Sequence, residues 1–415
     1  MKFIDLFCGI GGFHQALTNL GYKCVYACDI DPKCRETYFE NYGIKPEGDI
    51  RSINIKKIPK FDILTSGFPC QTFSKAGNQR GFDDDRGLLF FSICKIVKYH
   101  KPKYLILENV KNIATHDKGN TWNVIKKNIK KLGYYTYDTP LILNAMQFGI
   151  PQNRERAIIL CKRKDFGILQ DKPSLKIVKT ISIGSIIRDN EYEDNKKYRI
   201  KGKLKATEQI WNSFLKILSE NDINIPKFPI WTDWWDSNGD GTTITRKDPK
   251  LSDKENSKLI KNRQIAFYTK YKRWIDKNRE FYKTNIKLLK PWLTESRKNK
   301  LWQGAVRKLE WQAGDLLDNT MKTVLWTSRG SGIRVKKPDY IPTLVAMSMV
   351  PVYGAESRFL TPRELCRLQS FSEDFKFNEK FIYKQLGNAV NVKVIQSSAN
   401  FLINEKPLFK IKKKH

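Results

Sequence analysis

The stretch FIDLFCGIGGFHQAL, residues 3–17, decides the fold, because an apolar run leads into a glycine-rich turn and then into a helical pattern. Phe13, Ala16, Leu17 and Leu20 recur at helical spacing and predict one apolar helix face. Glycines let the backbone approach a ligand closely, and the N-terminus of a helix favours a carboxylate or a phosphate. Taken alone, this strand, turn and helix fit any nucleotide cofactor, or only a tight turn.

Four further apolar runs follow, separated by stretches long enough to form helices. They are KCVYACD (23–29), FDILTSG (61–67), KYLILENV (103–110) and RAIILCK (156–162). Short runs rich in Ile, Leu and Val and bounded by Gly, Pro or charged residues are typical of buried strands. Strands that alternate with helices predict an α/β fold, with a mostly parallel sheet and helices on both faces.

Two acidic residues stand where a cofactor site needs them. Asp29 ends the second predicted strand, roughly 20 residues after the glycine turn, where dinucleotide sites place the acid that binds the ribose. Asp49, in the tripeptide GDI, precedes the third predicted strand, where a carboxylate could accept a hydrogen bond from an adenine amine. Two acids in these places favour a cofactor site over a purely structural turn.

The segment SGFPCQTFS, residues 66–74, follows the third predicted strand and carries Cys70. Open α/β sheets place reacting groups at the carboxyl ends of their strands, so a cysteine held there by a proline is a candidate nucleophile. A thiol titrates near pH ~8.5, so the local environment must favour the thiolate. Taken alone, such a cysteine is more often a buried apolar residue than a catalyst.

Charged residues expected at the same sheet edge favour the catalytic interpretation of Cys70. Glu108, in ENV, ends the fourth predicted strand, and its carboxyl group could act on a ring nitrogen. Arg154 and Arg156 occupy alternate positions in GIPQNRERAII (149–159), so both point to one face. Arginines suit a carbonyl oxygen or a phosphate, and the alternative is a surface salt bridge.

The composition of the chain changes between about 165 and 330. Nine of the ten tryptophans fall there, interleaved with lysine and arginine in WTDWWD (231–236), YTKYKRW (268–274) and KLLKPWL (287–293). Such segments could stack on bases or grip a nucleic-acid backbone, but most of the tryptophans are expected to form the core of a second domain. Helical apolar spacing returns in KQLGNAVNVKVIQSSANFLI (384–403).

Charge and composition narrow the classes of partner. The 415 residues carry 76 lysines and arginines against 43 acidic residues, a formal net charge of +33. This surplus predicts salt-dependent attraction to nucleic acid, although a lysine-rich genome would produce the same excess. No apolar run approaches the ~20 residues that span a bilayer, so we expect no membrane partner and a cytoplasmic protein, nuclear only in a eukaryotic host.

The eight cysteines are scattered and do not form a disulfide framework. Cys24, Cys28 and Cys34 cluster, but no second cysteine pair or spaced histidine pair completes a zinc set. We expect buried thiols and no metal.

Taken in order, these motifs resemble the DNA (cytosine-5) methyltransferase family, and its bacterial restriction-modification members most closely. The resemblance covers about 1–165 and 340–400. It rests on DLFCGIGGF, GDI, GFPCQTFS, RGLLF, ENV, QNRER, RELCRLQSF and QLGNAVNV. It implies a Rossmann-like methyltransferase fold with an inserted target-recognition domain, and S-adenosylmethionine as the methyl donor.

The resemblance also assigns roles to single residues. In the cofactor site, Asp29 would bind the ribose, Asp49 the adenine amine, and Asn388 would close the pocket. The family often has Glu where this chain has Asp29, which puts affinity for the cofactor in doubt, not activity. The full cofactor set is Phe7, Gly9, Gly11, Gly12, Asp29, Ile30, Asp49, Ile50, Pro69, Leu89 and Asn388.

For catalysis, the resemblance implies that Cys70 attacks carbon 6 of a flipped cytosine while Glu108 binds the ring nitrogen N3 and the exocyclic amine. Arg156 would contact the cytosine O2, and Arg154 would support the flipped nucleotide. Residues expected to touch DNA are Gln71, Ser74 and Thr343.

The expected domains are a catalytic domain over 1–180, completed by 380–410, and a target-recognition domain over 181–379. Double-stranded DNA is the expected partner, with a functionally paired restriction endonuclease and a monomeric state implied by resemblance. Two alternatives stay open. One is a tRNA cytosine-5 methyltransferase of the same fold, and the other is a non-catalytic DNA-binding relative.

Overall fold

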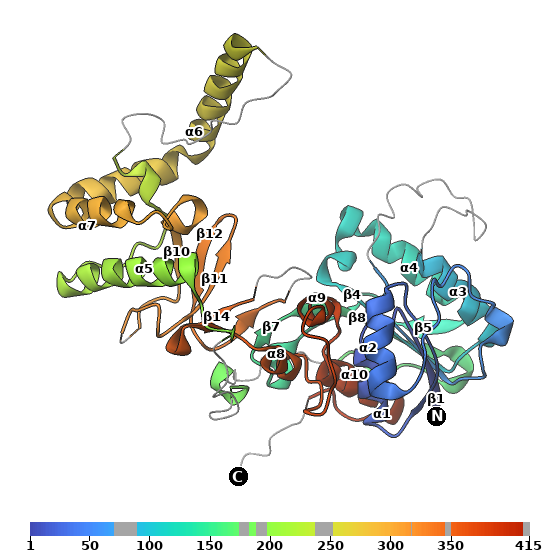
Figure 1. The fold of residues 1–415 in the computed structure, drawn as a ribbon. Helices are drawn as coiled ribbons and strands as arrows, with labels where there is room; N and C mark the ends of the chain where they lie inside the picture. The colour runs from blue at the N-terminus through green and yellow to red at the C-terminus, as the bar shows by residue number, and fades with distance from the viewer. Residues whose placement is uncertain are drawn as a thin grey trace. The chain divides into compact units, whose positions relative to one another are not determined.

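The computed structural model describes residues 1–69, 89–173, 182–187, 197–236, 252–316, 318–344 and 350–409. The chain divides into two compact units, which are coloured along the sequence in Figure 1. The first unit comprises Met1–Arg188, Asp339–Ser348 and Thr361–His415, and the second comprises Asp189–Pro338 and Met349–Leu360. The first unit thus takes in 181–188, 339–348 and 361–379, which the sequence had placed in the second domain.

A seven-stranded sheet organises the first unit. Four strands, in the order β2, β1, β3 and β4, run parallel, as predicted, and β8 then pairs antiparallel to β4. Strands β5 and β6 share the far edge of β8. The strands are β1 (Lys2–Leu6), β2 (Lys23–Cys28), β3 (Ile63–Ser66), β4 (Tyr104–Val110), β5 (Tyr134–Thr136), β6 (Leu141–Asn144) and β8 (Glu155–Arg163).

The register of the parallel strands aligns their carboxyl ends. Leu6 of β1 lies beside Cys28 of β2 on one side and beside Ser66 of β3 on the other, and Ser66 in turn pairs with Leu107 of β4. The residues that follow these positions therefore meet at one edge of the sheet. This edge is where open α/β sheets bind their ligands.

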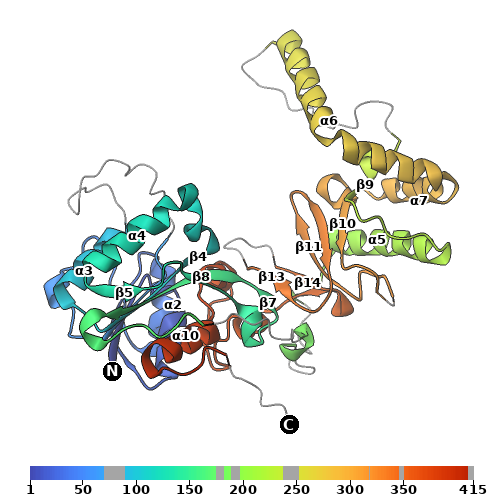
Figure 2. The same cartoon turned by 180° about the vertical axis from the view of Figure 1, so that it is seen from behind.

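Helices cover both faces of this sheet, as predicted. On one face α1 (Gly12–Thr18) lies against α10 (Val392–Asn404), as Figure 1 shows, and α2 (Pro32–Tyr42) joins α1 through the rings of Tyr38 and His14. On the other face α3 (Leu89–His100) and α4 (Asn120–Lys131) lie side by side, as seen from behind in Figure 2. Their buried apolar residues pack on β1, β3 and β4 and form the main core.

Three shorter elements complete the first unit. The helices are α8 (Pro362–Leu368) and α9 (Ile382–Asn388), which contact each other. The third is a two-stranded sheet of β7 (Gln152–Asn153) and β13 (Ile341–Pro342). This pairing joins Ile341–Pro342 to the first unit, although no sequence pattern marked the segment.

In its described residues, the second unit contains a six-stranded sheet and three α-helices. The sheet order is β15, β14, β11, β12, β10 and β9. The strands are β9 (Ile230–Trp231), β10 (Lys308–Gln312), β11 (Leu325–Arg329), β12 (Gly332–Lys336), β14 (Val352–Tyr353) and β15 (Arg358–Phe359). The helices are α5 (Gly202–Glu220), α6 (Asp253–Thr284) and α7 (Ile286–Lys298).

Tryptophans form much of the core of the second unit. Trp211 and Trp302 are fully buried, and their rings pack edge-on with centroids 5.9 Å apart. Six of the nine tryptophans of this region belong to one buried cluster, which comprises Trp211, Trp235, Trp292, Trp302, Trp311 and Trp326. The prediction that most of them form a core is confirmed. Within the described part of the chain, no helix is long and apolar enough to cross a membrane.

Candidate active site

The candidate site lies at the carboxyl edge of the first unit's sheet, around Gly67. A Cβ atom built on Gly67 would lie 3.6 Å from Oε2 of Glu108, 3.6 Å from the ring of Phe13 and 3.9 Å from Cγ1 of Val390. Residues from β4, α1 and the segment between α9 and α10 thus meet around Gly67, which precedes Cys70 by three residues. Cys70 itself, with Gln71 and Ser74, lies outside the described residues.

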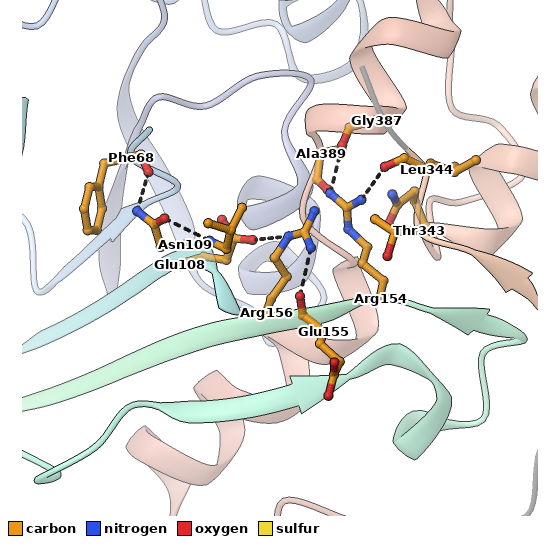
Figure 3. A network of polar contacts seen from close by, with 12 residues as sticks. Phe68, Glu108, Asn109, Arg154, Glu155, Arg156, Thr343, Leu344, Gly387 and Ala389 are labelled. Atoms are coloured by element: carbon orange, nitrogen blue, oxygen red, sulfur yellow. Dashed lines mark hydrogen bonds and ion pairs between the residues drawn. The ribbon is translucent and has the colours of Figure 1, made fainter. Parts of the chain in front are cut away.

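Glu108 forms an ion pair with Arg156 at this edge (Figure 3). Nε of Arg156 lies 3.0 Å from Oε1 of Glu108, and the two side chains are only 18% and 11% exposed. Burial raises the pKa of Glu108, although the cations of Arg156 and Arg154 act against that rise. A carboxyl group whose pKa is raised in this way is suited to share or exchange a proton with a ring nitrogen. The structure therefore brings two of the expected catalytic residues together.

Asn109 braces the chain just before Cys70, a role that the sequence reasoning missed. Its side chain is buried, and Nδ2 donates a 2.8 Å hydrogen bond to the carbonyl oxygen of Phe68. Its Oδ1 accepts from the amide of Val110 at 2.9 Å. The position of Asn109 directly after Glu108, at the end of a strand, could have identified it.

Arg154 has different surroundings from those expected of a nucleotide contact. Its guanidinium is buried and donates to the carbonyl oxygens of Leu344, Gly387 and Ala389 (Figure 3). Burial lowers the pKa of Arg154 to about 9, so the group remains a cation at neutral pH. The guanidinium of Arg154 is therefore buried against backbone carbonyl oxygens.

The glycine loop after β1 is tied to the end of β2, as the cofactor reading requires. The amide of Gly9 donates to Oδ2 of Asp29 at 2.8 Å, and the amide of Asp31 donates to Oδ1 of Asp29 at the same distance. Phe7, Gly9 and Gly11 have positive φ values of 55°, 53° and 87°. The loop therefore turns sharply where the strand ends.

Gly11 and Gly12 are required by close packing. A Cβ on Gly11 would lie 2.1 Å from the ring of Tyr42, and one on Gly12 would lie 2.7 Å from Cγ2 of Val390. By contrast, a Cβ on Gly9 would meet no atom within 4 Å, so the loop leaves open space at that position. This open space beside the Asp29 carboxylate leaves room for a bound ligand.

The remaining expected residues have varied surroundings. Asp49 forms an ion pair with the exposed Arg51 at 2.9 Å, so its carboxylate already has a partner. Oγ1 of Thr343 donates to the carbonyl oxygen of Asn153 at 2.7 Å. Ile50 is buried and Leu89 half-buried, while exposed positions are held by Ile30, Pro69 and Asn388.

The clustered cysteines are buried free thiols, as expected. Burial raises the pKa of Cys24, Cys28 and Cys34 to about 12, so none of them is a thiolate at neutral pH. Among the described residues, no group of three or more His, Cys, Asp or Glu side chains could hold a metal ion.

Comparisons with known proteins agree with this geometry. The family model for C-5 cytosine-specific DNA methylases matches residues 1–404. The chain is 32% identical over 440 residues to the type II methyltransferase M.BanI of Aneurinibacillus aneurinilyticus, a match that covers 95% of this chain and 94% of that protein. It is 46% identical over 189 residues to M.HhaI of Haemophilus parahaemolyticus, covering 46% of this chain and 56% of that protein.

A solved structure supports the fold alone. A putative DNA modification methyltransferase encoded within an Escherichia coli prophage covers 97% of this chain, with a TM-score of 0.53 and 19% identity. The parallel sheet, the glycine loop and the acid at the end of β2 define the class of Rossmann-like methyltransferases. Within that class the chain belongs to the C-5 cytosine-specific DNA methylase family, and its enzyme class is DNA (cytosine-5-)-methyltransferase.

Proposed function

We propose that this DNA cytosine methyltransferase acts on a cytosine flipped out of the duplex, with Cys70 as its nucleophile and Glu108 as the group that handles the ring nitrogen N3. The observation that carries the proposal is the buried Glu108–Arg156 pair, which lies beside Gly67, three residues before Cys70. A carboxyl group and a guanidinium at this spacing match the N3, amine and O2 edge of a cytosine.

The cofactor site supports S-adenosylmethionine as the methyl donor. Bound there, this sulfonium compound supplies an electrophilic methyl group. The open space at Gly9 gives room for it, and each Asp29 oxygen accepts one amide hydrogen bond, which leaves lone pairs for the ribose hydroxyls. Asn388 is exposed and would close the pocket, because Val390, two residues after it, packs on Gly12.

The protein's own residues divide the work of catalysis. The Cys70 thiolate would add to carbon 6, while Glu108 shares a proton with N3 so that no full negative charge builds up on the ring. Carbon 5 then becomes nucleophilic. Arg156 would hold the cytosine O2 and at the same time keep the Glu108 carboxyl group oriented through their 3.0 Å contact.

We further propose that the second unit is the target-recognition domain. In support, it forms its own tryptophan-rich core, and the helix α6 carries ten lysines and arginines against four acidic residues. Its relatives M.BanI and M.HhaI are named type II methyltransferases, so a functionally paired restriction endonuclease belongs to the same proposal. A monomeric state belongs to the same proposal.

The test is transfer of labelled methyl groups to unmethylated DNA and to tRNA in parallel, with the labelled context read by bisulfite sequencing. We expect label in cytosines of one short DNA motif and none in tRNA. Label in tRNA alone would favour the RNA branch of the fold. Absence of label in both would support the non-catalytic alternative, provided that the protein binds DNA.

A further inference from the structure

Arg154 connects two segments that are far apart in the sequence. Nη1 donates to the carbonyl oxygen of Leu344 at 3.0 Å, and Nη2 donates to those of Gly387 at 3.0 Å and Ala389 at 2.7 Å. The whole residue is only 3% exposed. A buried cation is costly, so three charge-assisted bonds to the main chain show that its position is well defined.

Two of these carbonyl oxygens belong to the residues on either side of Asn388, as Figure 3 shows for Gly387 and Ala389. The chain reaches the end of α9 here, where the backbone carbonyls have no helical partner and a cation is favourable. Arg154 thus fixes the backbone of Asn388 from the inside of the protein, while the Asn388 side chain is exposed.

The same segment packs directly on the glycine loop. A Cβ on Gly12 would approach Cγ2 of Val390 to 2.7 Å and its carbonyl oxygen to 2.8 Å, so these two backbones are already in close contact. Val390 also borders Gly67 at the other side of the site. A shift of the segment 387–390 would therefore disturb the glycine loop.

We propose that Arg154 is a positioning residue for the cofactor pocket, which acts by holding the backbone around Asn388 and not by contacting the flipped nucleotide. The inference rests on the proposed function, because it takes the glycine loop and Asn388 as the walls of the S-adenosylmethionine site. The two arginines of the QNRER motif thus have different roles. Arg156 acts on the cytosine site through Glu108, and Arg154 acts on the cofactor site.

Lysine cannot replace Arg154 in this role. The planar guanidinium directs several N–H groups toward carbonyls in different directions, whereas an ammonium is a point charge with shorter reach. The variant Arg154→Lys keeps the charge but loses part of the clamp, and Arg154→Gln loses both. Arg358 of the second unit is also 3% exposed and donates to a backbone carbonyl, so Arg358→Lys is a matched control.

The experiment measures binding of S-adenosylhomocysteine by calorimetry without DNA, for variants whose circular dichroism matches the wild type. We expect Arg154→Lys and Arg154→Gln to weaken binding at least tenfold, and Arg156→Lys and Arg358→Lys to leave it within twofold. In the Asn388→Ala background, Arg154→Lys should add little, because both changes act through the same segment. A general loss of stability would not produce this non-additivity.

Two results would overturn the inference. One is wild-type affinity in both Arg154 variants, and the other is a full additive loss when Arg154→Lys is combined with Asn388→Ala. Failure of the wild-type protein to bind S-adenosylhomocysteine would instead contradict the proposed cofactor site, and the inference with it.

Discussion

Glu108 and Arg156 occupy diagonal positions on neighbouring antiparallel strands, with Oε1 and Nε 3.0 Å apart. Glu108 of β4 lies opposite Ile158 of β8, and Arg156 stands two residues before Ile158 on the same face. Because side chains of a strand alternate between faces, this register directs both toward the edge near Gly67. The antiparallel pairing of β8 with β4 therefore brings the Arg156 guanidinium to the Glu108 carboxyl group.

Loss of the guanidinium should raise the pKa of Glu108. Burial already raises that pKa, and the positive charge of Arg156 opposes the rise by stabilising the carboxylate, so Arg156→Gln removes the opposition. The measurement is a pH titration of the carbon-13 signal of the Glu108 carboxyl group. Lys111→Gln, which removes the exposed partner of Glu155, is the control. An unchanged or lower pKa in Arg156→Gln would show that the pair does not govern Glu108.

Alanine at Gly12 should weaken binding of S-adenosylhomocysteine. The new Cβ would lie 2.7 and 2.8 Å from two atoms of Val390, so the glycine loop or the segment beside Asn388 must move. Gly43→Ala is the control: φ is 67° there and a Cβ meets no atom within 4 Å, so it costs only ~1 kcal/mol of backbone strain. Equal cofactor affinity in the two variants would contradict this packing.

Asp5→Asn should stabilise the protein more at pH 8 than at pH 5, relative to the wild type. Asp5 of β1 is fully buried, and burial raises its pKa well above 3.8, against the hydrogen bond from Thr65. When the pKa of a carboxyl group is higher in the folded protein than in the unfolded chain, the folded protein loses stability as pH rises above the unfolded-state value. Asparagine does not ionise, so Asp5→Asn removes this loss.

Urea unfolding of Asp5→Asn at the two pH values gives the comparison. Asp62→Asn serves as a control of opposite type. Burial acts to raise the pKa of Asp62, but the amide of Lys2 and the ammonium of Lys103 lower it below its usual value. Asp62 is therefore ionised at both pH 5 and pH 8, so its contribution to the free energy of unfolding should not change between them. The same stability difference for Asp5→Asn at both pH values would contradict the expectation.

Two tryptophans of the second unit should respond in opposite ways to truncation. Trp211 is fully buried and its Nε1 donates to the carbonyl oxygen of Val306 at 2.9 Å, so Trp211→Ala should cost about 3–5 kcal/mol in the free energy of unfolding. Trp274, on α6, is 40% exposed, so Trp274→Ala should change stability by less than about 0.5 kcal/mol and weaken DNA binding. Unfolding and DNA-binding titrations of both variants test this; unchanged DNA affinity in Trp274→Ala would remove it from the DNA surface.

Local patterns predicted the parallel half of the sheet well. The apolar runs at 2–7, 23–29, 61–67 and 103–110 contain β1, β2, β3 and β4, because buried strands need continuous apolar residues. The direction of β8 could not be predicted, since apolar periodicity is the same in both directions. Strands β5 and β6 are short and alternate weakly, so they carry little pattern of their own.

Contacts between distant segments were beyond local reasoning. The alternate spacing of Arg154 and Arg156 indicated one shared face, but nothing near them in the sequence indicates that Arg154 meets carbonyls 233 and 235 residues away. The apolar spacing over 384–403 predicted a helical region, yet α9 ends at Asn388 and α10 begins after Asn391, whose side chain accepts from the amide of Val394. Asn388 is exposed at this break.

The most direct test of the central claim is covalent capture of the enzyme by duplex DNA that carries 5-fluorocytosine at the target site. Fluorine at carbon 5 cannot leave as a proton does, so an adduct at carbon 6 persists after methyl transfer. With S-adenosylmethionine present, we expect a denaturation-resistant adduct with the wild type, none with Cys70→Ala, and at least ~100-fold slower formation with Glu108→Gln. An adduct formed equally well by Cys70→Ala, or at the wild-type rate by Glu108→Gln, would contradict the roles proposed for these two residues.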